Sequence, residues 1–166
     1  MEFLIKRLDT SCEKKNFDCG NDLLDNYLKR QAKQDVSRDL SACFVLVDRD
    51  KIVKGYYTLS ASSVQREDFP EELQNRLPPG YLDLPTVLLG RLATDKSIQG
   101  QGYGGIMLLS ALNKCLELSE NLGTLAVIVD PVDSNAVRFY EKYGFIYLPG
   151  TGKMFIPMKT IRQLPL

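Results

Sequence analysis

The spacing of apolar and polar residues predicts the secondary structure of the first half of the chain. Residues 3–8 are typical of a short strand, and residues 42–47 and 52–64 are predicted to form a β-hairpin around a polar turn. Between the first strand and the hairpin, Asn21 can cap a helix whose apolar positions follow the helical period of about 3.6 residues. These positions are Leu23, Leu24, Tyr27, Leu28 and Ala32.

Strands and helices alternate more strictly in the second half. The predicted elements are a strand over 86–93, a helix over 106–122, a buried strand over 125–129, a helix from Asp133 or Ser134 to Tyr143, and strands near 145–148 and 153–156. The segment between residues 65 and 85 contains four prolines, so we expect a loop with a short helix entered at Pro70. This order predicts an α/β (α+β) chain with a mixed sheet covered by helices.

The composition narrows the chemistry. The 166 residues include 21 Lys and Arg, 21 Asp and Glu, and no His. This length fits one compact domain or two very small ones, and we expect one domain over residues 1–166. Without His, a Ser-His-Asp or Cys-His mechanism and an imidazole metal site are excluded, so acid–base work falls to Tyr, Cys, Lys or carboxylates. The zero net charge gives no overall attraction to nucleic acid. Two local basic patches are candidates: Lys29 and Arg30 with Lys33 and Arg38, and Lys6 and Arg7 with Lys14 and Lys15.

The cysteines and the chain start bear on the cellular compartment. Cys12, Cys19, Cys43 and Cys115 show neither a C-x-x-C pair nor a zinc spacing, so we expect reduced thiols and no metal. Residues 1–7 are charged too early to be a signal peptide, and no apolar run approaches the roughly 18 residues of a membrane span. A cytoplasmic protein with no membrane association is therefore expected.

A glycine-rich turn between a predicted strand and a predicted helix carries the main chemical signal. Free backbone N–H groups and the helix dipole make such a turn an anion site. Gly100, Gly102 and Gly105 also satisfy the dinucleotide pattern G-x-G-x-x-G, with Asp130 as the ribose-binding acid. However, about 60 residues follow the turn, too few for the remaining units of a dinucleotide fold. A purely structural turn is the other alternative.

A third interpretation rests on family resemblance. The run QGQGYG from Gln99 to Gly104 resembles the Q/R-x-x-G-x-G/A motif of the GNAT superfamily of N-acetyltransferases. The run NAVRFYEKYGF from Asn135 to Phe145 resembles the closing signature of that family, and the element order matches it over nearly the whole chain. The resemblance implies the GNAT fold: a central mixed, mostly antiparallel sheet flanked by helices, with acetyl-CoA in a cleft between two splayed parallel strands.

The resemblance also implies roles for individual residues. Tyr140 would be the catalytic acid that protonates the departing thiolate, a role that suits a phenol with a pKa of about 10. The backbone of 92–94 would pair with pantetheine and form an oxyanion hole, and the amides of 101–105 would hold the pyrophosphate. The predicted acetyl-CoA-binding residues are Leu92, Ala93, Thr94, Gln99, Gly100, Gln101, Gly102, Tyr103, Gly104, Gly105 and Asn135.

Several of these residues have structural alternatives. Tyr140 lies among aromatic residues and could serve only to pack its helix, and Asn135 could instead help to cap that helix. Arg91 interrupts an apolar strand, either to face the substrate or to form a structural ion pair. Direct transfer in a ternary complex is favoured over a Cys acyl-enzyme, because Cys115 lies inside a helix and no His can activate a thiol.

The kind of amine that accepts the acetyl group is predicted from the absence of a Glu that could serve as general base. Many members of the family use a Glu near the central strand, yet no Glu lies between Glu72 and Glu117, and Asp95 is the only carboxylate nearby. An α-amine, with a pKa of about 7.7–8.0, is partly neutral at pH 7, whereas a lysine amine is not. The sequence therefore favours an α-amine acceptor.

A narrower resemblance points to the same acceptor. The runs 17–28, 34–35, 55–61 and 89–93 are similar to the acetyltransferase toxins of bacterial toxin–antitoxin pairs. This resemblance implies acetylation of the α-amine of aminoacyl-tRNA, a ribbon-helix-helix antitoxin and a homodimer. The balanced charge is the observation against it, because a tRNA-binding protein is expected to be basic. The alternatives are an acetyltransferase acting on a small-molecule, protein or peptide amine, and a non-enzymatic module that binds coenzyme A or a partner.

Overall fold

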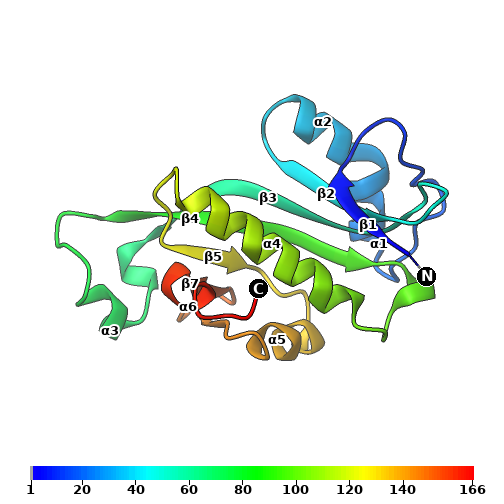
Figure 1. Ribbon diagram of the computed structural model, residues 1–166. Coiled ribbons are helices and arrows are strands. Elements are labelled where there is room, and N and C mark those ends of the chain that lie inside the picture. Colours follow the sequence, from blue (N-terminus) through cyan, green and yellow to red (C-terminus); the bar gives the residue numbers. More distant parts are fainter. Residues whose placement is uncertain (1) are drawn as a thin grey trace. The chain divides into compact units, whose positions relative to one another are not determined.

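The structure is a computed structural model that describes residues 2–166. Within these residues, seven strands form one sheet in the order β1-β2-β3-β4-β5-β7-β6 (Figure 1). The strands are β1 (Leu4–Arg7), β2 (Ala42–Val47), β3 (Val53–Gln65), β4 (Asp83–Thr94), β5 (Ala126–Val129), β6 (Ile146–Tyr147) and β7 (Met154–Pro157). The pairs β1–β2, β2–β3, β5–β7 and β6–β7 are antiparallel.

Helices connect these strands. The α-helices are α1 (Asp22–Asn26), α2 (Ala32–Ser37), α3 (Glu71–Gln74), α4 (Tyr103–Ser119), α5 (Ser134–Glu141) and α6 (Met158–Ile161). A π-helix, η1 (Tyr27–Gln31), joins α1 to α2, and two 3₁₀ turns are η2 (Arg66–Asp68) and η3 (Lys96–Ile98). The predicted mixed sheet with flanking helices is confirmed.

The chain forms two compact units, so the prediction of a single domain over residues 1–166 stays a prediction. The first unit comprises residues 2–60 and 89–111, and the second comprises residues 61–88 and 112–166. Strands β3 and β4 and helix α4 each contribute residues to both units. In the second unit, Leu125 N–H donates to the Pro85 carbonyl at 2.8 Å, and β4 and β5 run in the same direction (Figure 1).

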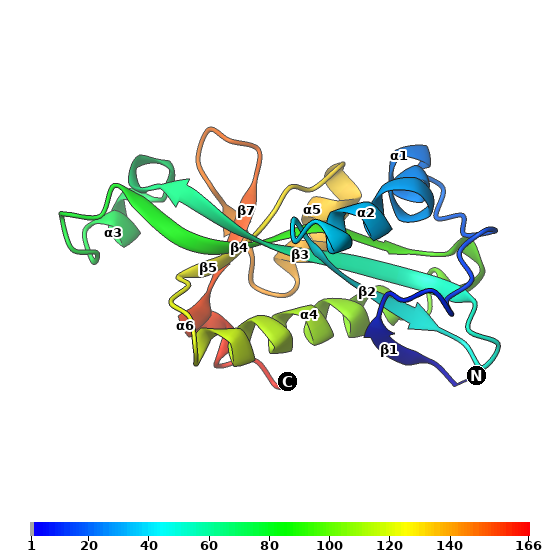
Figure 2. The same ribbon diagram turned by 90° about the horizontal axis from the view of Figure 1, so that it is seen from above.

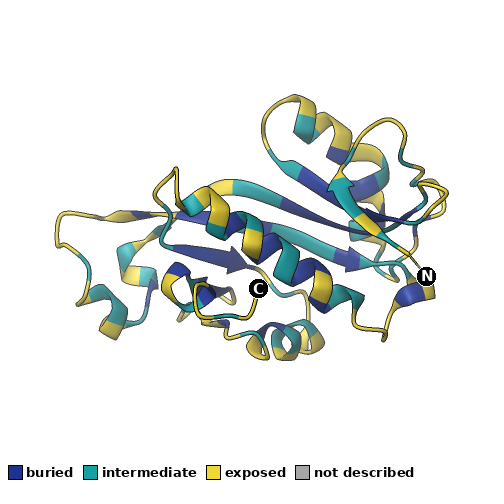
Figure 3. Cartoon of the chain, in the orientation of Figure 1, coloured by how far each residue is buried: buried dark blue, intermediate teal, exposed yellow. Residues whose placement is uncertain are grey.

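In the first unit, alternate residues of β3 face helices on opposite sides of the strand. A side chain at Gly55 would contact Met107 of α4, and the Tyr57 hydroxyl lies 3.2 Å from Ser110 Oγ of the same helix. Tyr56, between them, packs on Tyr27 and donates its hydroxyl proton to Leu24 O at 2.6 Å. The strand is therefore covered on both faces (Figure 2), in agreement with the buried strand centres in Figure 3.

Most predicted elements are present, with shifted ends. Helix α4 begins at Tyr103, three residues before the predicted start, and therefore includes Gly104 and Gly105. The π-helical form of η1 and the short elements η2, η3 and α6 were not predicted from the sequence.

The apolar stripe predicted to follow Asn21 is partly wrong. Asn21 does cap α1, since its side chain accepts from Leu23 N and Leu24 N. However, Leu23 is 82% exposed. Asp25 is buried in that turn instead, because its carboxylate accepts a hydrogen bond from Cys19 N–H at 2.9 Å.

Candidate active site

The glycine turn holds a row of backbone amides without partners. Gly100 and Gly102 adopt φ values of +77° and +88°, and a Cβ added at either would meet nothing within 4 Å. No hydrogen bond joins the backbone N–H groups of residues 100–105 to the described part of the chain. Free backbone donors at the start of a long helix are suited to phosphate oxygens, so the binding of pyrophosphate at this turn stays a prediction.

Two glutamine side chains fix the entry to this turn. Gln99 Nε2 donates to Thr94 O at 2.8 Å and to Cys19 O at 2.9 Å, and Gln101 Nε2 donates to Ser97 O at 3.3 Å. The Gln99 side chain thus ties the end of β4 to the segment before α1. A local motif could not reveal the hydrogen bond from Gln99 to Cys19, because the two residues are 80 positions apart in the sequence. The contact of Gln99 with the cofactor stays a prediction.

The end of β4 lies tightly against β3. A Cβ added to Gly55 would stand 3.1 Å from Ala93 O and 2.6 Å from Met107 Sδ. Only glycine at this point lets the two strands and α4 approach so closely. Gly55 therefore helps to position Leu92, Ala93 and Thr94. This role of Gly55 was not predicted from the sequence, in which residues 55–61 were notable only for their similarity to the acetyltransferase toxins.

Asp95, at the end of β4, is engaged structurally. Its carboxylate accepts from Asp18 N–H at 2.9 Å, from Ser97 N–H at 3.0 Å and from Ser97 Oγ at 2.6 Å. Burial alone would raise the pKa of Asp95, but these hydrogen bonds outweigh it and lower the pKa overall. A carboxylate held in this way is a weak base, so the residue that the sequence left as the nearest candidate base is a turn-forming residue.

Arg91 does not form, within residues 2–166, the ion pair that was one of its two sequence-level alternatives, and it packs on an aromatic ring instead. Its Cζ lies 3.4 Å from the centroid of the Tyr27 ring, a cation–π contact. The Tyr27 hydroxyl donates to Asp35 Oδ2 at 2.8 Å, and the ring stacks on Tyr56. Among the described residues, no carboxylate forms an ion pair with Arg91, so the expected structural ion pair is absent.

In the second unit, Tyr140 combines a buried ring with a hydroxyl that is not fully buried. The residue is 8% exposed and packs on Phe139 and Phe145, with ring centroids 5.2 and 5.1 Å away. Its hydroxyl has no hydrogen-bond partner among the described residues, yet it is not enclosed. Burial raises the pKa of Tyr140, so the phenol stays protonated and available as a donor through the neutral range.

The ends of α5 explain how Tyr140 is presented. Asp133 caps the helix, because its carboxylate accepts from Ala136 N–H at 2.8 Å. The helix ends at Glu141, and three residues later Gly144, with φ of +98°, turns Phe145 back against the Tyr140 ring. Asn135 is exposed and accepts a hydrogen bond from Arg138, so the capping alternative for Asn135 is wrong. Its contact with coenzyme A stays a prediction.

The thiols are unsuited to nucleophilic work. All four cysteines are free, and burial raises the pKa of Cys19, Cys43 and Cys115 to about 12. A thiol must ionise to attack a thioester, so these three stay inert near neutral pH. In residues 2–166, no group of His, Cys, Asp or Glu side chains could hold a metal ion, and no helix is long and apolar enough to cross a membrane.

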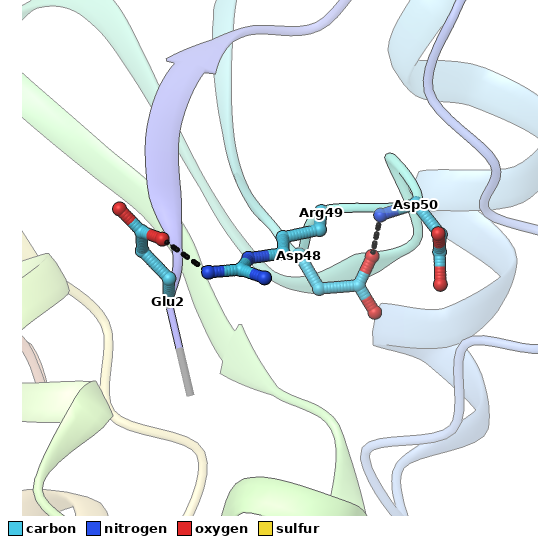
Figure 4. Close-up of a pocket in the computed structure, with 4 residues that line it drawn as sticks. All are labelled: Glu2, Asp48, Arg49 and Asp50. Atoms are coloured by element: carbon cyan, nitrogen blue, oxygen red, sulfur yellow. Dashed lines mark hydrogen bonds and ion pairs between the residues drawn. The ribbon is translucent and has the colours of Figure 1, made fainter.

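A pocket lies at the turn between β2 and β3 (Figure 4). It is lined by Glu2, Asp48, Arg49 and Asp50. Arg49 is paired with Glu2 at 3.0 Å, and Asp50 N–H donates to Asp48 Oδ1 at 2.9 Å. None of the predicted site residues lines this pocket.

Known proteins match this arrangement over most of the chain. The model of the acetyltransferase (GNAT) domain matches residues 39–147. The tRNA-acetylating toxin of Mycobacterium tuberculosis is 31% identical over 144 residues, which are 87% of this chain and 84% of that protein.

Two solved structures share the fold. AtaT complexed with acetyl-methionyl-tRNAfMet has a TM-score of 0.90 and 31% identity, and the match covers 98% of each chain. A Tyr-to-Phe mutant of the AtaT toxin bound to the C-terminus of the antitoxin AtaR has a TM-score of 0.82 and 28% identity, again over 98% of each chain. With its free amide turn, its β4 end and its Tyr140-bearing helix, this chain belongs to the GNAT family of acetyltransferases.

Proposed function

We propose that this protein transfers the acetyl group of acetyl-CoA to the α-amine of aminoacyl-tRNA and thereby acts as a toxin that blocks translation. The observation that carries the proposal is the likeness, over nearly the full chain, to AtaT with its acetylated tRNA and to the tRNA-acetylating toxin. The local distribution of charge supports the same acceptor.

The neutral total charge conceals a basic stretch in η1 and α2. Residues 27–38 include one acid, Asp35, whose carboxylate accepts a hydrogen bond from the Tyr27 hydroxyl. The same stretch contains four cations: Lys29, Arg30, Lys33 and Arg38. None of the four cations forms an ion pair with a described residue, whereas Lys6 of the other candidate patch pairs with Asp9 at 2.8 Å. Unpaired surface cations are what phosphate neutralisation requires.

The proposed reaction uses main-chain donors and one phenol. The amides of residues 101–105 would hold the pyrophosphate, and the backbone of Leu92, Ala93 and Thr94 would bind the pantetheine arm and polarise the thioester carbonyl. Asn135 would contact the arm from α5. The neutral amine attacks the carbonyl carbon, the C–S bond breaks, and Tyr140 donates its proton to the leaving thiolate. The proton that the nitrogen loses on becoming an amide passes to water, and the Tyr140 phenolate regains a proton from water.

An α-amine acceptor explains how the reaction could run without a protein base. Asp95 is held by three hydrogen bonds, and burial keeps three cysteines protonated. The α-amine, with a pKa of about 7.7–8.0, is partly neutral at physiological pH and can attack directly. A lysine acceptor would instead need a base to remove its proton.

The proposal includes the partners and the compartment. Acetyl-CoA is the cosubstrate, a ribbon-helix-helix antitoxin would neutralise the toxin, and the cytoplasm holds both the tRNA and a reducing environment for the four free thiols. The homodimer is part of the same proposal. Strand β6, with Ile146 and Tyr147 each 50% exposed at the end of the sheet, is a candidate interface.

A direct experiment tests the function. Purified protein, labelled acetyl-CoA and charged tRNA are incubated, and the RNase digest is examined by mass spectrometry. We expect N-acetylaminoacyl-adenosine, together with growth arrest on expression that Tyr140→Phe relieves. Acetylation of small-molecule or protein amines with unmodified tRNA would contradict the proposal and favour the second acetyltransferase alternative.

A further inference from the structure

Arg91 is a charged side chain without a charged partner in an otherwise apolar part of β4. It is partly buried, and no described residue forms an ion pair or hydrogen bond with its guanidinium. Arginine is always charged in proteins, and a half-buried charge without a counter-ion is unfavourable. Such a group is ready to bind an anion, because the anion would supply the interaction that the fold leaves out.

The guanidinium is also held in place. One of its faces lies 3.4 Å from the Tyr27 ring centroid, while Tyr27 itself is fixed by its hydroxyl bond to Asp35 and by stacking on Tyr56. The π-helix η1 begins at Tyr27, and π-helical turns are frequent at functional sites. A stacked guanidinium keeps the N–H groups at its edge free for bidentate binding, with little loss of rotamer freedom on binding.

Arg91 lies close along β4 to the residue whose backbone is proposed to contact the thioester. Arg91 and Ala93 lie on the same face of β4, two residues apart, which is about 7 Å along a strand. Under the proposed function, the backbone of Ala93 contacts the thioester. An anion bound by Arg91 would then belong to the part of the acceptor next to the attacking amine.

From these observations we propose that Arg91, seated on Tyr27, binds the terminal phosphodiester of the aminoacyl-tRNA acceptor strand and so positions the α-amine. This inference rests on the proposed function. The acceptor end carries its amino acid on the nucleotide that this phosphodiester attaches, so one contact fixes both groups. Acetyl-CoA also carries phosphates, and the experiment separates the two sources of anion.

The test compares Arg91→Gln with Arg7→Gln. Arg7 is a matched control because its Cζ lies over the Phe44 ring at 5.4 Å, so the control loses the same charge and the same type of contact. KM and kcat are measured for aminoacyl-tRNA and for acetyl-CoA over a range of salt concentrations, with thermal unfolding of each variant.

We expect Arg91→Gln to raise KM for aminoacyl-tRNA roughly tenfold to a hundredfold, as for the loss of a charge-assisted hydrogen bond. The salt dependence of that KM should flatten by about 0.7 on a log–log plot, the value for one phosphate of a single strand. KM for acetyl-CoA should stay at the wild-type value, and Arg7→Gln should behave as wild type. Arg91→Lys should recover the salt dependence but not the full affinity, since it keeps the charge without the stack.

Any of four results would overturn the inference. A raised KM for acetyl-CoA in Arg91→Gln would assign the anion to the cosubstrate. Unchanged KM and kcat for aminoacyl-tRNA in Arg91→Gln would show that Arg91 does not bind the acceptor. Arg91 would be structural if Arg91→Gln and Arg91→Lys both lost activity equally with the two substrates and both had a lower melting temperature. Wild-type protein that fails to acetylate aminoacyl-tRNA would instead overturn the proposed function, and this inference with it.

Discussion

At the scale of single residues, Tyr140 has the features of a proton donor and also those of a packing residue. Its ring is buried between Phe139 and Phe145, so the sequence-level alternative of helix packing describes the ring correctly. The hydroxyl is different, since it has no partner in the described chain and is not enclosed. A packing role needs only the ring, so the phenolic oxygen is what a substitution should remove.

We therefore predict that Tyr140→Phe lowers kcat by about 10²–10⁴-fold, the range for loss of a general acid. KM for acetyl-CoA and the melting temperature should change little, because the ring and its packing remain. Tyr143→Phe is the matched control, since Tyr143 packs on Phe139 from the same segment at 5.4 Å. Steady-state kinetics that show equal effects of the two substitutions would assign Tyr140 to packing alone.

The pH dependence follows from the same residue. The rate constant kcat/KM should rise as the acceptor α-amine loses its proton, at a pH of about 7.7–8.0 or below. An acid is effective only while protonated, so activity falls as pH rises through the pKa of Tyr140. Burial raises that pKa, which moves the fall above the ordinary range of tyrosine. Single-turnover measurements should thus show a rise and a plateau, and a fall that begins as soon as the amine is neutral would contradict the assignment.

At the scale of elements, the glycine turn depends on backbone conformation and on empty space. Gly102→Ala should cost roughly 1–2 kcal/mol because an L-residue is strained at positive φ. The added methyl would also enter the space before the free amides, so KM for acetyl-CoA should rise. Gly152 offers a control, since it has φ of +75° and a Cβ added there would meet nothing within 4 Å.

Gly152→Ala should therefore show a similar loss of stability with an unchanged KM for acetyl-CoA. Chemical denaturation measures the first quantity, and isothermal titration with coenzyme A measures binding directly. If Gly102→Ala bound coenzyme A as tightly as Gly152→Ala does, the turn would not hold the pyrophosphate.

Elements with a strong local signal could be predicted from sequence, and the others could not. The Asn21 cap, the apolar strand at 126–129 and the glycine turn each depend on neighbouring residues. The π-helix η1 depends on where Tyr27 is held, by Asp35 and by the distant Tyr56. Helix α6 has four residues, too few to produce a helical pattern.

At the scale of the whole molecule, charge counts mislead because pairing is not visible in the composition. The equal numbers of acids and bases argued against a tRNA substrate. Folding uses some cations in pairs across long sequence separations, as in Arg49 with Glu2 and Lys96 with Asp18. The basic stretch is left unpaired, and only the folded structure distinguishes the two groups of cations. The stack of Arg91 on Tyr27 was equally hidden, since it joins β4 to η1.

The basic stretch leads to a prediction about affinity for tRNA. Replacing Arg30, Lys33 and Arg38 by Gln should weaken binding of aminoacyl-tRNA and flatten its salt dependence by about 0.9 for each duplex phosphate that is no longer neutralised. All three side chains are exposed, so the melting temperature should change little. The matched control replaces three exposed cations of the second unit, Lys153, Lys159 and Arg162, by Gln.

Both triple variants have the same net charge, so the comparison separates local binding from the overall field of the protein. Filter binding over a range of salt concentrations gives the slope for each variant. A local interface requires that only the first variant lose affinity. If both variants weakened equally, tRNA would be attracted by the total charge, and η1 and α2 would not form its binding surface.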